Sequence, residues 1–401
     1  MHVAKAMRYL PTYNFKNKKA LIRTDFNVPL DAHCQVTDSI RIDRTIPTIR
    51  KVLEDGGAAI LVSHLGRPKQ GYENTLSLQH LVPYLSSSLH TKVVFAKDCI
   101  GSEAQQKARQ LRPGQVLLLE NIRFYPEEEK GDKKFAQALA QLGDVYINDA
   151  FGVIHRAHAS IKPITPYFKD KLAGYLLQAE MQHADQLLAG AQKPFTAIIG
   201  GAKISDKMEA IQCLLGKVDN LLLGGGVANT FQQALGGQLG DSLVETDQLQ
   251  LALSLVKQAQ DNQVQFVLPT DARISNQLND QAQTKLVASN AIPGGSMALD
   301  IGPQTMATFH KLIAGSQTIL WAGPIGAFEY TNFRHGTQAV AAAVVAATSQ
   351  GAFSFIGGGD SAMAIKSLGY SNQVSYISTG GGALLAYIAN KNLPGIQALA
   401  T

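Results

Sequence analysis

The sequence predicts an α/β protein made of two Rossmann-like domains, each a parallel sheet flanked by helices. Short, nearly continuous apolar runs alternate with longer helical patterns along the whole chain, as expected for buried parallel strands and their crossover helices. The length of 401 residues favours two domains over one core. The apolar runs also end differently in the two halves, at charged side chains in the first and at glycines in the second.

In the first half, three apolar runs predict strands: AAILVSHL (58–65), QVLLLEN (115–121) and DVYIND (144–149). Helical patterns lie between them, RTIPTIRKVLEDGG (44–57) and DKKFAQALAQLG (132–143). The second closes on a glycine, which commonly ends helices. We interpret the run Glu127-Glu128-Glu129 as the solvated face of a loop.

The second half repeats this scheme. Its strand candidates are TAIIGG, NLLLGGG, VQFVLPT, QTILWAG, AFSFIGGG and QVSYIST. Between the halves, GYLLQAEMQHADQLLAGAQKPF (174–195) predicts a helix that ends at Gly190 and is followed by a linker. We place the domain boundary at the start of this helix.

Composition narrows the class of protein. A hydrophobic content of 45% with 17% charged residues is typical of a globular chain. The most apolar stretch, near 339–347, is far shorter than the roughly 18 residues of a membrane span, and residues 1–20 lack the apolar region of a secretory signal. Three cysteines without CxxC spacing favour reduced thiols in the cytoplasm and no structural zinc.

The net charge of +5 comes from basic residues that stand singly at strand ends. Nucleic-acid surfaces usually carry basic runs, so an anionic small molecule explains the excess more simply.

Polar side chains follow the predicted strands of the first half, at the edge where ligands bind in open α/β sheets. Arginine forks match the geometry of carboxylates and phosphates, whereas a lone histidine is more often a core residue. The segments LIRTDFN, LVSHLGRP, LLLENIRF and NDAFGVIHRAH carry Asp25, Asn27, His64, Arg67, Arg123, His155 and Arg156, and Arg41 adds a further arginine.

In the second half, GGGDSA (357–362) follows a predicted strand and could open a helix. Successive glycines let backbone N–H groups approach a phosphate, and a helix N-terminus favours negative charge. The alternative is a tight turn capped by Asp360. The motif also fits a loose dinucleotide fingerprint, but that fingerprint needs an acidic residue about 20 positions later, and Asp360 is the last acidic residue of the chain.

GGAKISDK (200–207) places Lys203 and Lys207 four residues apart, on one face if a helix begins there. Two ammonium groups beside a glycine turn suit a polyphosphate, while the alternative is a pair of solvated lysines. A complete P-loop motif is absent, because Val218 follows Gly216-Lys217. Two halves that can each bind an anion indicate an enzyme that transfers a phosphoryl group between two phosphorylated molecules. The rivals are a nicotinamide dehydrogenase and a nucleotide-sensing binding module.

These motifs, from LIRTDFNVPL (21–30) to STGGGA (378–383) and NLPGIQAL (392–399), resemble the phosphoglycerate kinase family nearly end to end. The resemblance implies an N-terminal domain (1–173) for 3-phosphoglycerate or 1,3-bisphosphoglycerate. It also implies a nucleotide-binding domain (174–387) that begins with the interdomain helix, and a tail (388–401) that packs back on the first domain. The implied reaction is reversible phosphoryl transfer from 1,3-bisphosphoglycerate to ADP in glycolysis, with Mg²⁺, after domain closure. A cytoplasmic monomer is implied, without nucleic-acid or membrane partners.

The resemblance also implies roles for individual residues. Arg41, Lys203 and Lys207 would be catalytic, and Asp360 would hold the metal. The substrate-binding set would be Asp25, Asn27, Arg41, His64, Arg67, Arg123, His155 and Arg156. The nucleotide-binding set would be Lys203, Lys207, Ala298, Glu329 as ribose ligand, Gly357, Gly358, Gly359, Asp360 and Ser361.

Three alanines depart from the family pattern. Ala322 stands where the family usually has the asparagine of WNGP, Ala298 where it often has glycine in MGLDIGP, and Ala386 where it commonly has the glutamate of GGGASLE. The departures imply a missing amide near the nucleotide phosphates, an added methyl at the adenine pocket and a missing carboxylate near the hinge.

Overall fold

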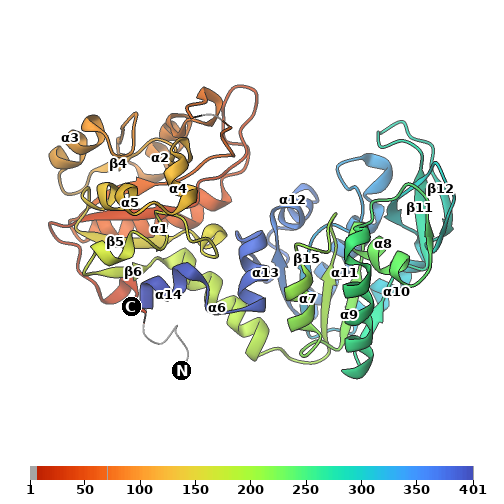
Figure 1. Cartoon of the computed structure of the whole chain (residues 1–401). Coiled ribbons are helices and arrows are strands. Elements are labelled where there is room, and N and C mark those ends of the chain that lie inside the picture. Colours follow the sequence, from red (N-terminus) through yellow and green to blue (C-terminus); the bar gives the residue numbers. More distant parts are fainter. Residues whose placement is uncertain (1–6, 70, 401) are drawn as a thin grey trace. The chain divides into compact units, whose positions relative to one another are not determined.

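The computed structural model describes residues 7–69 and 71–400. These residues form parallel sheets flanked by helices, which confirms the predicted fold class (Figure 1). They make two compact units. Unit 1 is the chain up to Gln182 together with the segment from Asn390, and unit 2 is His183–Ala389. The units divide inside a helix, whereas the predicted domain boundary lies at the start of that helix.

Unit 1 is built on a sheet with the strand order β3-β4-β2-β1-β5-β6, in which every pairing is parallel. Its strands are β1 (Lys19–Thr24), β2 (Ala58–Val62), β3 (Val93–Phe95), β4 (Val116–Leu118), β5 (Val145–Asp149) and β6 (Lys171–Ala173). Its helices are α1 (Ile40–Glu54), α2 (Val82–Leu89), α3 (Ser102–Gln110), α4 (Pro126–Lys130), α5 (Lys133–Ala140) and α14 (Pro394–Ala400). All five residues of β2 are buried, as expected for an internal strand.

Helix α1 shows why these elements pack as they do. Ile42, Ile46, Ile49 and Val52 recur at helical spacing and are all buried in the core of unit 1. The helix begins at Ile40, earlier than the predicted start at residue 44, so Arg41 lies in its first turn.

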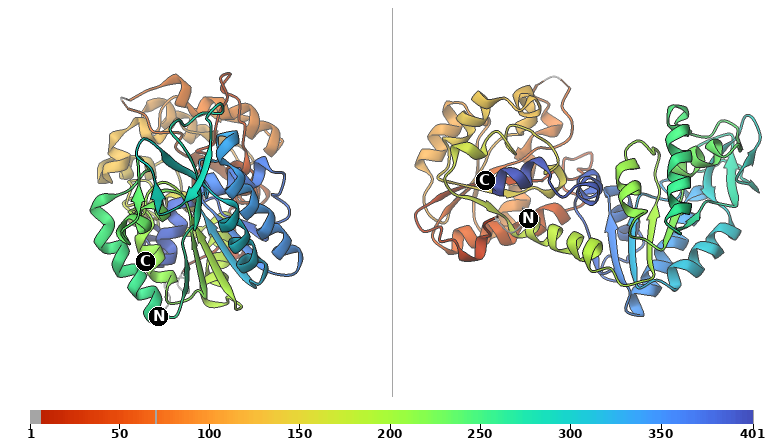
Figure 2. Two further views of the ribbon diagram at one scale, coloured as in Figure 1. Left: turned by 90° about the vertical axis from the view of Figure 1, so that its right-hand side faces the viewer. Right: turned by 60° about the horizontal axis from the view of Figure 1, so that its bottom comes forward.

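The segment after unit 2 returns to unit 1. Both views place α14 beside β6 (Figures 1 and 2). The Gly395 N–H donates to the carbonyl of Ile154 at 3.0 Å. A Cβ at position 395 would lie 2.4 Å from Ile154 Cδ1, so any larger residue would require the Ile154 side chain to shift.

Unit 2 has a parallel sheet of order β10-β8-β7-β15-β16-β17. Its strands are β7 (Phe195–Ile199), β8 (Asn220–Leu223), β10 (Gln265–Val267), β15 (Thr318–Ala322), β16 (Phe353–Gly357) and β17 (Tyr376–Ile377). Its helices are α7 (Met208–Leu214), α8 (Gly225–Ala234), α9 (Leu249–Asp261), α10 (Pro303–Ala314), α11 (His335–Ser349), α12 (Gly359–Ser367) and α13 (Gly381–Ala389). Helix α6 (Tyr175–Ala189) runs from unit 1 into unit 2.

Unit 2 also contains strands outside the alternating pattern. An antiparallel sheet joins β12 (Lys285–Ala288), β11 (Asp271–Ser275) and β14 (Met297–Ile301), and β9 (Gln238–Leu239) pairs with β13 (Ala291–Ile292). These strands were not predicted from the sequence.

Candidate functional site

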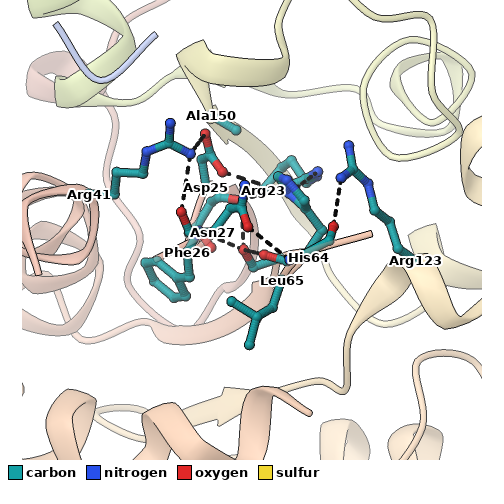
Figure 3. Close-up of polar contacts among 12 residues, drawn as sticks. Arg23, Asp25, Phe26, Asn27, Arg41, His64, Leu65, Arg123 and Ala150 are labelled. Atoms are coloured by element: carbon teal, nitrogen blue, oxygen red, sulfur yellow. Dashed lines mark hydrogen bonds and ion pairs between the residues drawn. The ribbon is translucent and has the colours of Figure 1, made fainter. Parts of the chain in front are cut away.

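The polar residues predicted in unit 1 lie where its central strands end. Asp25 follows β1, His64 follows β2, and Arg123 lies in the 3-10 helix η5 (Ile122–Phe124) after β4. These strands are neighbours in a parallel sheet, so their carboxyl ends share one edge. Figure 3 shows their side chains gathered there with Arg41 and Asn27.

Asp25 and Arg41 form an ion pair at this edge. Arg41 Nη1 donates to Asp25 Oδ2 at 3.0 Å and to the Asn27 carbonyl at 3.3 Å. Burial disfavours the charged form of Asp25, but Arg41 and the other nearby cations outweigh it and hold the pKa of the carboxyl below its ordinary value. The side chain of Asn27 is also fixed, because its Oδ1 accepts a bond from the Gly66 N–H at 2.8 Å. The pair therefore presents a fixed guanidinium.

His64 lies deeper, at 2% exposure. Its Nδ1 is 3.4 Å from Arg23 Nη2 and 3.7 Å from Asp25 Oδ1. Burial lowers the pKa of His64 well below its ordinary value, and Arg23 is among the cations that add to this effect while Asp25 opposes it. His64 is thus neutral at physiological pH.

Two residues of this cluster were not predicted from the sequence. Arg23 is only 1% exposed, and Glu128 is fully buried in α4. The expectation that Glu128 lies on a solvated loop face is wrong, because its carboxylate accepts bonds from the Ser160 hydroxyl and backbone N–H at 2.6 and 2.9 Å. A charged residue inside the apolar run ALIRT was the available signal for Arg23.

The remaining predicted residues of unit 1 are less tightly held. Arg123 Nη1 donates to the Gly66 carbonyl at 2.9 Å, and its Nε lies 3.3 Å from Glu129 Oε1. Arg67 and Arg156 are exposed, and neither side chain forms an ion pair within the described residues. Burial, with help from Arg156, lowers the pKa of His155 to about 4. The structure therefore brings Asp25, Arg41 and His64 together and leaves Arg67 and Arg156 free to meet an anion.

In unit 2, the predicted glycine loop joins β16 to α12. Gly357 ends the strand, Gly358 has a φ of 97°, and Gly359 is the first residue of the helix. A positive φ of this kind is readily adopted only by glycine. Ser361 Oγ accepts a bond from the Gly323 N–H at 2.7 Å, so Ser361 ties this loop to the one after β15. Gly359 and Asp360, the first residues of the helix, are exposed, and a helix N-terminus is a suitable place for a phosphate.

The lysines of the β7 loop do not share a helix face. Helix α7 begins only at Met208, and Lys207 is its N-cap residue. A turn, closed by the Lys207 N–H on the Ile204 carbonyl, instead brings Lys207 Nζ to 3.3 Å from the Lys203 carbonyl. Burial lowers the pKa of Lys207, while Asp206 and Asp360 oppose the change. Lys203 is exposed.

The two other nucleotide candidates, Ala298 and Glu329, lie on a strand and on a loop. Ala298 lies on β14, where its N–H donates to Ser242 Oγ at 2.8 Å, and it lines a pocket with Gly225 and Ile325. Glu329 is exposed on the segment after β15 and is not part of that pocket's lining. Of the departing alanines, Ala322 ends β15 and is 3% exposed, and Ala386 is half-buried on α13.

Asp360 fits a magnesium ion that is shared with a nucleotide. It is exposed in the first turn of α12, and its carboxylate accepts no hydrogen bond within the described residues, so it is open to a ligand. Those residues contain no group of three or more His, Cys, Asp or Glu side chains that could hold a metal. One carboxylate is enough, since Mg²⁺ usually keeps several waters and is completed by substrate phosphates.

Comparison with known proteins places this architecture in a family. The model of phosphoglycerate kinase sequences matches residues 10–391. The chain belongs to the phosphoglycerate kinase family. It is therefore an enzyme of the kinase class, and the prediction of family and class is confirmed.

Individual phosphoglycerate kinases are similar over nearly their whole length. The protein of Porphyromonas gingivalis is 46% identical over 412 residues, which covers 96% of this chain and 98% of the relative. The cytosolic protein of Triticum aestivum is 47% identical over 386 residues, with 96% of each covered.

Solved structures of the family agree with the fold. The phosphoglycerate kinase of Coxiella burnetii has a TM-score of 0.82 at 37% identity, and that of Pyrococcus horikoshii has 0.85 at 27% identity. Each comparison covers 98% of both chains. Among the described residues, no helix is long and apolar enough to cross a membrane.

Proposed function

We propose that the chain catalyses reversible transfer of the acyl phosphoryl group of 1,3-bisphosphoglycerate to ADP, giving 3-phosphoglycerate and ATP. The observation that supports this proposal is that each unit gathers groups suited to an anion at the carboxyl edge of its sheet. Unit 1 offers Arg41 and Arg123 around Asp25, and unit 2 offers a glycine loop with Lys207. Family membership supports the same reaction.

Unit 1 binds the glycerate substrate. Arg67, Arg156 and Arg123 suit its phosphate, since guanidinium forks pair with phosphate oxygens. Asp25 and Asn27 provide acceptors for its hydroxyl, and the donors of Arg41 and His64 face its carboxyl or acyl phosphate. His155 lies beside Arg156 and completes the set.

Unit 2 binds the nucleotide. The phosphates meet the backbone of Gly357, Gly358 and Gly359 at the N-terminus of α12, with Lys203 and Lys207 beside them. Ser361 holds the loop in place. The purine occupies the pocket at Ala298, and Glu329 takes the ribose.

Asp360 would hold Mg²⁺ together with the phosphates of ADP or ATP, since it is an exposed hard oxygen donor beside the glycine loop. When bound, Mg²⁺ neutralises phosphate charge and orients the reacting oxygens.

The transfer step needs alignment more than acid–base chemistry. A terminal oxygen of ADP attacks the phosphorus of the acyl phosphate, the bond from phosphorus to the acyl oxygen breaks, and 3-phosphoglycerate leaves as a carboxylate. That leaving group needs no proton. Arg41, Lys203 and Lys207 stabilise charge on the migrating group in a loose, in-line transition state.

Arg41 is prepared for this role. Its Nη1 donates to Asp25 and to the Asn27 carbonyl, and these bonds fix the guanidinium. The other N–H groups of Arg41 stay available to the substrate. Because the two anion sites belong to different units, direct transfer requires closure that excludes water from the reactive acyl phosphate. We further propose that the enzyme acts as a cytoplasmic monomer.

A coupled assay tests the function. Purified protein is given ADP, Mg²⁺ and 1,3-bisphosphoglycerate, and ATP formation is followed through a second enzyme. We expect turnover that requires both substrates. Nicotinamide-dependent hydride transfer would favour the dehydrogenase alternative, and nucleotide binding without turnover would favour a sensing module. Either result would refute the proposal.

A further inference from the structure

Arg23 is a charged side chain at a position where an apolar residue would be expected. It lies within β1, paired with Val62 and Asn148 of the neighbouring strands, and is 1% exposed. A buried charge is tolerated only when it is paired and hydrogen-bonded. Arg23 meets this condition, since its Nε donates to Ser160 Oγ at 2.8 Å and its Nη1 to the Thr24 carbonyl.

Glu128 anchors the same guanidinium from α4. Its Oε1 lies 3.9 Å from Arg23 Nη2. Both of its carboxyl oxygens accept bonds from Ser160. The residues thus form a closed set, in which Ser160 bonds to both ions. Buried ion pairs contribute little net stability compared with apolar residues of similar volume, which points to positioning as the purpose of this one.

The second Nη of Arg23 reaches His64. It lies 3.4 Å from Nδ1 of the imidazole. A guanidinium only donates hydrogen bonds, so Nδ1 must be the acceptor and the ring proton must be on Nε2. Asp25 Oδ1 also faces Nδ1, but at 3.7 Å it is beyond hydrogen-bonding distance.

Nε2 of His64 is left for a ligand. It has no hydrogen-bond partner in the described part of the chain, and it is not among the buried unpaired atoms, so solvent reaches it. An N–H at this place would donate to an oxygen of the substrate beside Asp25 and Arg41 (Figure 3).

We infer that Arg23, anchored by Glu128 and Ser160, fixes His64 as the neutral tautomer with its proton on Nε2. His64 then meets the substrate as a hydrogen-bond donor and not as a cation. The second statement rests on the proposed function, which supplies a carboxylate or acyl phosphate as acceptor. Arg23 is thus a positioning residue, while the exposed arginines supply the charge.

The charged surroundings of His64 agree with this assignment. Arg23 and Asp25 face it from the end of β1, Arg41 from α1 and Arg123 from η5. Burial favours the neutral ring most, and the three arginines add to it while Asp25 opposes them. We therefore expect no imidazolium at His64 within the pH range of activity.

The tautomer can be read directly by long-range ¹H–¹⁵N correlation NMR. His64→Gln identifies the His64 signals, because they disappear from its spectrum. We expect an Nε2-protonated neutral ring in the free protein and in the 3-phosphoglycerate complex. A ring protonated on Nδ1, or an imidazolium at neutral pH, overturns the inference.

A double variant tests whether Arg23 is the cause. Arg23→Met with Glu128→Gln removes both buried charges together, so neither is left unpaired. We expect mixed His64 tautomers and an affinity for 3-phosphoglycerate about tenfold lower, as for one lost hydrogen bond. Nucleotide affinity should not change. An unchanged tautomer would show that Arg23 does not position the ring.

A second pair of variants keeps Arg23 and Glu128 intact, in case the double variant does not fold. The amide of His64→Gln places an N–H near the position of Nε2, whereas that of His64→Asn lies near Nδ1. We expect Gln to retain 3-phosphoglycerate binding about tenfold better than Asn; better binding by Asn overturns the inference. Absence of ATP formation by the wild type would refute the proposed function alone, and the tautomer would still decide the role of Arg23.

Discussion

Asp149 lies at the end of β5 and is fully buried, with no charged side chain among the causes that set its pKa. Its Oδ1 accepts a bond from the Leu177 N–H at 3.0 Å, in the first turn of α6. A Cβ at Gly174 would come within 2.2 Å of that oxygen, so the carboxyl is enclosed by the chain entering the helix. Its Oδ2 is buried without a hydrogen bond. Replacing Asp149 by asparagine keeps the bond to Leu177 and removes the ionisable group.

The expected effect follows from the pKa. Burial raises the pKa of Asp149 from 3.8 to about 7, and the Thr48 side chain on α1 and the N–H groups at the start of α6 only partly oppose it. Between these values the folded protein holds a proton that the unfolded chain has lost, so stability falls as pH rises. The contribution of Asp149 to the free energy of unfolding is complete below about pH 4 and lost above pH 7. The difference between the two pKa values corresponds to about 4 kcal/mol.

The measurement is a difference between variant and wild type, so that all other titrating groups cancel. We expect Asp149→Asn and the wild type to be similarly stable near pH 4, and the variant to gain about 4 kcal/mol relative to the wild type by about pH 8. Hydrogen exchange of the β5 amides reports the unfolding of unit 1. Trp321, the single tryptophan, reports unit 2 by fluorescence.

Asp300→Asn is the matched control. Burial also raises the pKa of Asp300 to about 7, and this residue lies on β14 of unit 2. Its effect should appear in the Trp321 signal, and that of Asp149→Asn in the β5 amides. A difference between Asp149→Asn and wild type that stays constant from pH 4 to pH 8 would refute the reasoning, because Asp149 would then titrate at an ordinary pKa.

Three further predictions concern the proposed function. Arg41→Ala should lower kcat by roughly a thousandfold, which corresponds to the loss of about 4 kcal/mol of transition-state stabilisation, while nucleotide affinity is kept. Arg50→Ala, on the exposed face of the same helix, is the control. Normal kcat in Arg41→Ala would exclude Arg41 from the mechanism. In calorimetry, Asp360→Asn should weaken binding of Mg-ADP more than binding of metal-free ADP, whereas the control Asp261→Asn on α9 should change neither. Equal losses of affinity for Mg-ADP and metal-free ADP in Asp360→Asn would contradict a metal role. The radius of gyration in small-angle scattering should fall most when 3-phosphoglycerate and nucleotide are both bound; no compaction would argue against closure.

The parallel sheets could be predicted from sequence because their strands are buried on both faces and read as apolar runs. Strand β12 could not, because most of its residues are exposed and it carries no such run. Its place is set by pairing with β11, which has Asp271 and Arg273 among its residues and again lacks an apolar pattern. Pairing of this kind is a tertiary property that single-sequence periodicity does not contain.

Asp25 and His64 could be predicted as strand-end residues because each stands within two residues of the end of an apolar strand. The network behind them could not. Arg23 is 137 residues from Ser160 in sequence, and Glu128 stands in a run of three acidic residues that reads as a solvent-facing surface. Only the fold shows that one of the three turns inward. The spacing of Lys203 and Lys207 was informative, but the helix that would explain it starts later, so a turn brings the lysines near each other.

The return of the chain to unit 1 has a consequence for biosynthesis. The segment from Asn390 leaves the ribosome after the whole of unit 2 has been made, and until then Ile154 and Ile161 lack the α14 segment that packs against them through Gly395. Unit 2, continuous in sequence, can complete its fold during translation, whereas unit 1 must wait with an apolar surface uncovered. Nascent chains that stall within α13 should therefore be bound by chaperones or degraded through their first unit, even though that unit was synthesised first.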